Sequence, residues 1–339
     1  MLPKPLNLVT EQLMTLFDNE HPIDLTGDLF TPNGLTRLQC LPSVGPKTAI
    51  RLAERFSFWE RLAEATAEDL MATLAKAQQK KIPEILGWIP RVGVPAPLPA
   101  GVKAFGQFDP EWPQWLRLIS DPPAVVFVRG SLPPGGSLGV VGTRHPTRFG
   151  FKFVELLVAE ASSRGTGVVS GLALGIDGAA HRAALANGVL TWAILGSGVD
   201  CPSPREHLEL AEEIISVGGG LLSEQLPGTP PIGRSLVARN RLQSAASFAL
   251  VVAQCGIPSG TLHTARFALQ QGRRLVVPRP RPPWDQERES AGNLALSDPN
   301  GCSPAVLQAS GALVKEILRR KPVADLVIHD QADIARIWE

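Results

Sequence analysis

The sequence of 339 residues has few cysteines, and none of them is close to another. The four cysteines stand alone at positions 40, 201, 255 and 302, a distribution that favours neither a disulfide framework nor a zinc site. No apolar run approaches the roughly 20 residues of a membrane span, and the first residues do not form a secretory signal. We therefore expect a cytoplasmic protein without a membrane partner and without a bound metal.

Three familiar site motifs are missing as well. The chain has no Walker A sequence, no complete Gly-x-Gly-x-x-Gly followed by an acidic residue, and no Gly-x-Ser-x-Gly around Ser170 or Ser259. Asp177 and His181 stand one helical turn apart, which is more typical of a helix cap with a bracing residue than of an acid–base couple. We expect no catalytic residue and no cofactor.

Acidic residues are absent from one long stretch. Positions 226–284 contain no Asp or Glu, although the formal net charge of the whole chain is only +1. The same window contains eight arginines: Arg234, Arg239, Arg241, Arg266, Arg273, Arg274, Arg279 and Arg281. Guanidinium groups bind phosphate oxygens well, so the window favours an anionic ligand such as a nucleic acid. The alternative is a solvated basic face in which some arginines pack against helices.

The chain divides by composition. Residues 1–89 are expected to form a small all-α domain, with helical spacing of apolar residues over 8–17, and residues 90–104 form a proline-rich linker. Residues 105–320 are expected to form an α/β domain, and residues 321–339 a short extension. The segment 278–296 lacks any periodicity and is predicted to be a mobile loop.

The α/β domain is predicted from seven apolar runs separated by helical stretches. These runs are 124–128, 138–142, 167–170, 191–195, 221–223, 248–253 and 274–277. Continuously apolar strands between helices indicate a doubly wound, Rossmann-like, mostly parallel sheet with both faces covered. Ligands of such sheets bind at the carboxyl ends of the strands, where 142–144, 170–171 and 259–261 all fall.

The turn over 170–181 connects a strand to a helix through small residues. Glycines allow the backbone to approach a ligand, and a helix N-terminus carries partial positive charge. This combination predicts an anion site.

A second motif lies in the N-terminal domain. Pro42-Ser43-Val44-Gly45, followed by Lys47 and Ala49, resembles the helix-hairpin-helix motif, whose turn holds a DNA phosphate. Residues 1–104 carry 11 basic and 11 acidic side chains, so a sterile-alpha-motif-like domain for protein contacts is an equal alternative.

The order of motifs resembles the DNA-processing protein A (DprA/Smf) family. The matching segments are Val140–Arg144, Ser170–His181, Ser223-Glu224, Arg239–Arg241, Ser259–Thr261 and Gly272-Arg273. The resemblance covers about residues 105–315. It implies an extended Rossmann-like domain that binds single-stranded DNA, forms a homodimer, and in natural transformation protects incoming DNA and helps to load the RecA recombinase. It also implies that the protein is not an enzyme.

Several positions depart from the family pattern. Leu174 replaces a common Arg or Lys, Cys201 stands where Tyr is frequent, and Val237-Ala238 replaces Phe-Pro, which removes an aromatic residue suited to base stacking. Residues 321–339 are too few for the winged-helix-like domain found in many members.

The expected DNA site combines the resemblance with the converging segments. Arg144, Arg239 and Arg241 are expected to contact phosphates, and backbone or side-chain donors are expected from Ser170, Gly171, Asn240, Ser259, Gly260 and Thr261, with Lys47 as an addition. The alternative function is that of a lysine-decarboxylase-like phosphoribohydrolase, with Glu224 as a candidate base. The helix after Thr261 has His263 and Arg266 where such an enzyme needs a glutamate, which favours binding.

Overall fold

The computed structural model describes residues 27–298, 315, 317, 319–320 and 322–339. The helix expected over 8–17 lies outside the described residues. The chain forms two compact units, and it passes between them three times. One unit contains the described residues up to Trp112 together with Asp121–Phe127, and the other contains Pro113–Ser120 and the described residues from Val128 onward.

The first unit is mostly helical. Its elements are α2 (Pro32–Gln39), α3 (Pro46–Phe56), α4 (Trp59–Ala63), α5 (Ala67–Thr73), α6 (Lys76–Gln79), α7 (Ile82–Trp88), the 3-10 turn η1 (Ile89–Arg91) and strand β1 (Val102–Gly106). The Arg37 guanidinium is buried in this unit, where it lies 3.7 Å from the Trp59 ring centroid and donates to the Val92 carbonyl. Strand β1 begins within the stretch 90–104.

The expected hairpin is present in this unit between α2 and α3. Ser43 has a φ of 62°, and Gly45 is the N-cap of α3. Ala49 is fully buried, which lets the two helices pack closely. The sequence thus predicted the shape of the hairpin. This shape alone does not distinguish DNA binding from protein contact.

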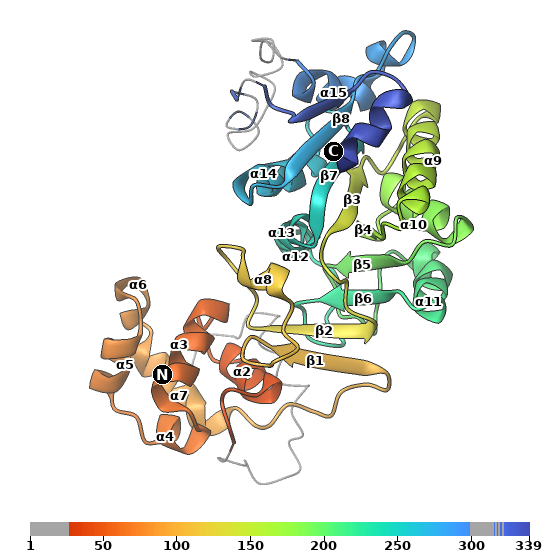
Figure 1. Cartoon of the computed structure of the whole chain (residues 1–339). Helices are drawn as coiled ribbons and strands as arrows, with labels where there is room; N and C mark the ends of the chain where they lie inside the picture. Colours follow the sequence, from red (N-terminus) through yellow and green to blue (C-terminus); the bar gives the residue numbers. More distant parts are fainter. Residues whose placement is uncertain (1–26, 299–314, 316, 318, 321) are drawn as a thin grey trace. The chain divides into compact units, whose positions relative to one another are not determined.

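The second unit is built on parallel strands. After β2 (Val125–Gly130) come β3 (Ser137–Gly142), β4 (Val168–Ser170), β5 (Thr191–Leu195), β6 (Gly220–Ser223), β7 (Ser247–Gln254), β8 (Arg274–Pro278) and β9 (Leu326–Ile328). Strands β3 to β9 lie in the order β6-β5-β4-β3-β7-β8-β9, and every neighbouring pair is parallel (Figure 1). This confirms the doubly wound, mostly parallel sheet.

Helices cover both faces of this sheet. Successive side chains of each strand point to opposite faces, so each face presents apolar residues to the helices that pack on it. Leu138 and Val140 of β3 pack on one face with α9 (Arg148–Ser163) and α10 (Ile176–Ala186). Val141 packs on the other face with α14 (Thr261–Gln270) and α15 (Ala291–Leu296). Other helical elements of the unit are α8 (Gln114–Arg117), η2 (Arg205–His207), α11 (Leu208–Ser216), α12 (Gly233–Ala238) and α13 (Asn240–Ala245). Figure 1 shows α9 to α11 on one side of the sheet and α12 to α14 on the other.

The segment 278–296 corrects a prediction, because it is structured rather than a free loop. It forms η3 (Trp284–Gln286), η4 (Arg288–Ser290) and α15. Asn293 is fully buried: its Oδ1 accepts from the Cys255 N–H at 2.7 Å, and its Nδ2 donates to the Val252 carbonyl at 3.0 Å. Side-chain-to-backbone bonds of this kind hold a segment in place without producing a sequence period, which is why the pattern did not reveal them.

The last residues add to the sheet. Strand β9 pairs with β8 over 326–328, and η5 (Ala332–Trp338) buries Ile334 and Ile337 against the α9 face. This strand was not predicted, because the sequence after residue 320 was expected to form only a short extension. Residues 326–338, which lie in the segment expected as an extension, thus complete one end of the core.

We predict that Asn293→Ala lowers the free energy of unfolding by roughly 2–4 kcal/mol, because the buried Cys255 N–H and its neighbours lose their partner. Asn187→Ala is the matched control. Its amide donates to the Ala183 carbonyl at the exposed end of α10, and the change should cost less than about 0.5 kcal/mol. Denaturant unfolding measures both. Equal stability of the two variants would contradict a supporting role for Asn293.

Candidate nucleic-acid interface

The loop after β3 presents Arg144 to solvent at the carboxyl edge of the sheet. Gln254, the buried last residue of β7, holds this loop. Its carbonyl accepts from the Thr143 N–H at 2.7 Å, and its side-chain amide accepts from the Thr147 N–H and donates to the Thr147 hydroxyl, both at 2.9 Å. Gly150 leaves room for the Gln254 side chain, since an added Cβ would overlap its oxygen. Arg144 is therefore an exposed cation on a rigidly anchored loop.

The turn after β4 was expected to offer hydrogen-bond donors to an anion, but its first two residues do not face solvent. The Ser170 hydroxyl is fully buried and donates to the Val140 carbonyl at 2.7 Å. The Gly171 N–H donates to the Gln243 side-chain oxygen at 2.9 Å. Both groups were expected to face a ligand, but their donors are used within the protein. The turn instead shapes the edge: Leu172 (φ 61°) and Gly175 (φ 79°) have left-handed backbones, as the tight turn requires.

This turn also touches the loop of Arg144. The Ile176 N–H donates to the Thr143 carbonyl at 3.1 Å, and a Cβ added at Gly175 would meet that same carbonyl and the Arg144 backbone. The structure thus brings two of the three expected segments into direct contact.

Arg239 lies beneath this turn and is buried, with an exposed fraction of 7%. Its guanidinium donates to the Ile194 carbonyl at 2.6 Å, lies 3.9 Å from the Asp177 carboxylate, and occupies the space that a side chain at Gly171 would need. Burial raises the pKa of Asp177, and the Arg239 charge opposes that shift. Its guanidinium therefore connects the ends of β4 and β5 from inside the protein, and the expected phosphate contact of Arg239 stays a prediction.

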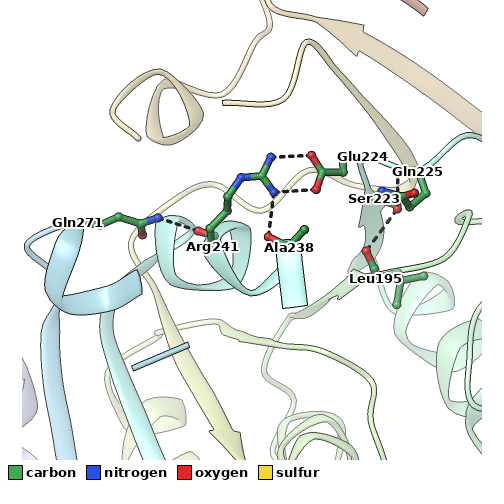
Figure 2. A network of polar contacts seen from close by, with 7 residues as sticks. All are labelled: Leu195, Ser223, Glu224, Gln225, Ala238, Arg241 and Gln271. Carbon is green, nitrogen blue, oxygen red and sulfur yellow. Dashed lines mark hydrogen bonds and ion pairs between the residues drawn. The ribbon is translucent and has the colours of Figure 1, made fainter. Parts of the chain in front are cut away.

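Arg241 is also paired internally. Its guanidinium forms two hydrogen bonds of 2.6 Å with the Glu224 carboxylate and a third, of 2.8 Å, with the Ala238 carbonyl (Figure 2). Gln271 donates to the Arg241 carbonyl at 3.0 Å. The side chains of Arg241 and Glu224 are only 8% and 11% exposed. Arg241 is thus held inside the protein as well, and its expected phosphate contact stays a prediction. Glu224 is held as the partner of Arg241.

Asp177 and His181 brace the turn, although the N-cap of α10 is Gly175 and Asp177 is the second residue of the helix. His181 is fully buried, and its Nδ1 lies 2.7 Å from the Thr191 hydroxyl. Burial and the neighbouring His207 and Arg239 lower the pKa of His181 to about 3, so the ring is neutral at physiological pH. A neutral imidazole bonded to a strand residue is a structural element of the turn.

The third segment, at the N-terminus of α14, remains partly open. Gly260 is exposed, and Ser259 is half-buried with its hydroxyl accepting from the Thr261 N–H at 3.2 Å. Thr261 itself is buried. Asn240 is buried too, and its side-chain oxygen accepts from Gln243 at 3.0 Å.

The expected site therefore separates into an outer and an inner set. Arg144 and Gly260 are exposed and Ser259 is partly so, whereas Ser170, Gly171, Asn240, Thr261 and the two arginines of 239–241 lie inside. Lys47 is exposed on the other unit. Leu174 and Val237, two apolar residues that depart from the expected family pattern, are 36% and 38% exposed. Sequence reasoning missed Gln254, whose signal was an amide side chain ending an otherwise apolar strand.

We predict that Glu224→Ala lowers the free energy of unfolding by about 3 kcal/mol, because it leaves the Arg241 charge buried without its carboxylate. The double variant Glu224→Leu with Arg241→Met should recover much of that loss, since neither charge then remains. Denaturant unfolding of the single and double variants gives the coupling. Additive effects of the two changes would show that the pair is not a unit.

Two kinds of site are not found in the described part of the chain. No helix among these residues is long and apolar enough to cross a membrane. No group of three or more His, Cys, Asp or Glu residues there is arranged to hold a metal ion.

The chain is similar in sequence to proteins of known name. The chain is 37% identical over 206 residues to the DNA processing protein DprA of Bacillus subtilis, covering 60% of this chain and 69% of that protein. It is 32% identical over 249 residues to protein Smf of Escherichia coli, covering 71% of this chain and 64% of that one.

Two solved structures share the fold. That of DNA processing protein A from Streptococcus pneumoniae matches with a TM-score of 0.64 at 21% identity, over 90% of this chain and 97% of that one. A Helicobacter pylori DNA processing protein A, described for its single-stranded DNA binding mode, matches with a TM-score of 0.51 at 25% identity, over 64% of this chain and 94% of that one. The model of the DNA recombination-mediator protein A family matches residues 103–306, and the chain belongs to that family.

Proposed function

We propose that this protein binds single-stranded DNA along the carboxyl edge of its sheet and passes the strand to a recombinase. The observation that carries the proposal is the exposed Arg144, fixed by Gln254 at the edge where an α/β sheet binds its ligands. A cation anchored in this way contacts a phosphate without first losing the mobility of its loop. The family and the DNA-binding description of the H. pylori relative support the same ligand.

We assign two roles to the residues of the site. Arg144 contacts a phosphate directly, and Ser259 and Gly260 offer donors at the start of α14. The buried residues, with Arg239 and Arg241 foremost, fix the shape of the edge. Ser170, Gly171, Asn240 and Thr261 belong to this supporting set.

An enzymatic role is less well supported. A nucleotide-cleaving enzyme needs a free carboxylate as base, but Glu224 gives both its oxygens to Arg241. We propose that the protein is a binder and that it releases neither base nor phosphate from nucleoside monophosphates. Turnover by the purified protein that Glu224→Gln abolishes, with folding retained, would favour the phosphoribohydrolase alternative.

The partners follow from the mediator role. Protection of incoming DNA in natural transformation and loading of the RecA recombinase require the protein to hold the strand and the recombinase together, in the cytoplasm. A homodimer would place two DNA edges on one assembly. These partners are proposals that rest on the family.

We predict that Arg144→Ala weakens binding to single-stranded oligonucleotides roughly tenfold, because one charged hydrogen bond to phosphate is lost. The slope of log affinity against log salt should fall by about 0.7 for the one contact removed. Arg164→Ala is the matched control, since Arg164 is an exposed arginine at the opposite end of α9. Fluorescence anisotropy across a salt series measures both. If Arg144→Ala binds like the control variant, the edge is not the DNA site.

We predict that Lys47→Glu leaves the affinity of the full chain for duplex DNA unchanged, because non-specific DNA binding needs an excess of basic charge that residues 1–104 do not have. We therefore assign the hairpin of the first unit to protein contact. A gel-shift titration with duplex at low salt is the measurement, with Lys80→Glu as a control on the same unit. A selective loss for Lys47→Glu would return the hairpin to a DNA-binding role.

A further inference from the structure

A pocket of about 500 Å³ lies beside the loop of Arg144, within the second unit. It is lined by the first half of α9, the end of β8, the turn η3, and the end of β9 with residues that follow it. Because α9 follows β3 and all these strands are parallel, the pocket is at the same carboxyl edge as Arg144. Arg144 precedes the first lining residue, Arg148, by four positions.

The pocket combines aromatic and apolar lining with a cationic rim. Phe149 and Trp284 are stacked, with ring centroids 6.1 Å apart and planes at 29°, and both are half-buried. Phe153 and Ile334 add buried apolar surface. This lining gives a flat apolar ligand a surface on which to stack.

Three cations stand around the opening. Arg148, Lys152 and Arg279 are exposed lining residues, and Asp330 is the acidic side chain among them. Lys152 has an exposed ion pair with Glu155 at 3.1 Å, which contributes little and is easily exchanged for a phosphate. Arg279 donates to the Ser297 carbonyl at 3.3 Å. The charge of the rim therefore favours an anion next to the stacked ligand.

We propose that this pocket receives one unstacked base of single-stranded DNA, against Phe149 and Trp284, while the adjoining phosphates contact Arg148 and Lys152. The inference rests on the proposed function and adds a second contact to it. Stacking on aromatic side chains between basic residues is how proteins hold single strands without reading their sequence. A duplex keeps its bases paired and stacked, so a pocket of this kind selects the single strand.

The exposed Phe151 supplies a matched control. It lies two residues from Phe149 on the same helix and is 44% exposed, but it does not line the pocket. The test uses the full chain and two oligonucleotides of equal length, one of thymidines and one with abasic sugars. Trp284→Leu and Phe149→Leu should each weaken binding to the thymidine strand on the order of tenfold and change binding to the abasic strand little. Phe151→Leu should bind both strands like the wild type.

Further measurements separate the possible failures. Thermal melting of each variant shows whether it is folded, and for the wild type a photo-crosslink from 5-iododeoxyuridine should appear in the peptides that contain Phe149 or Trp284. If Arg144→Ala weakens binding while both pocket variants bind as wild type, or if crosslinks form only elsewhere, the pocket proposal fails and the proposed function stands. If the wild type binds no single strand, both fail. If thymidine monophosphate binds in a Trp284-dependent manner without competing with the strand, the pocket holds a free nucleotide and the strand proposal is overturned.

Discussion

The buried guanidinium of Arg239 is the constraint on which the carboxyl edge of this sheet depends. It occupies the space left by Gly171, donates to the Ile194 carbonyl at the end of β5, and stands opposite Asp177 in the first turn of α10. One charge thus connects two strand ends and a helix start. Such a group is costly to bury, so it stays in place only while all its partners do. The left-handed backbones of Leu172 and Gly175 follow from the turn that this arrangement closes.

A second set of polar contacts joins the buried turn after β4 to the exposed loop of Arg144. The turn that Arg239 supports meets the loop of Arg144 through the Thr143 carbonyl, and Gln254 holds the other end of that loop through Thr147. Gln254 also donates to the Ser290 hydroxyl, in the segment that carries Trp284. One amide side chain thus connects the loop of Arg144 with the segment that carries Trp284. A binding edge needs this rigidity, because each group that is ordered in advance lowers the entropy lost when the strand binds.

The sequence predicted the sheet better than the site. All seven apolar runs of the α/β domain are strands, since a strand buried on both faces is continuously apolar and this signal is local. Strand β9 was not predicted, although β4 is equally short, because β4 leads into the small-residue turn over 170–181 and β9 has no such turn after it. The arginine window did not reveal the internal pairing of two of its members. Arg239 and Arg241 lie beside the carboxylates of Asp177 and Glu224, which are outside the window. An absence of acidic residues nearby in sequence does not exclude acidic residues nearby in space. The aromatic pocket, made by segments over a hundred residues apart, has no local signal at all.

Because Arg239 and Arg241 are paired with carboxylates, their charges add little to the attraction of the chain for DNA. Charges that are buried and compensated contribute little to long-range attraction of DNA, so the field at the edge comes from exposed cations such as Arg144, Arg148, Lys152 and Arg279. Few such contacts would give a shallow dependence of affinity on salt, so the proposed binding of a single strand needs another source of affinity. Stacking of bases is that source in single strands, and it is independent of salt to first order. Val237 stands where the resemblance to the family implies an aromatic residue. Phe149 and Trp284 supply aromatic surface at the same edge of the sheet, so the chain keeps the chemistry that a single strand requires while it places that chemistry on a different pair of elements.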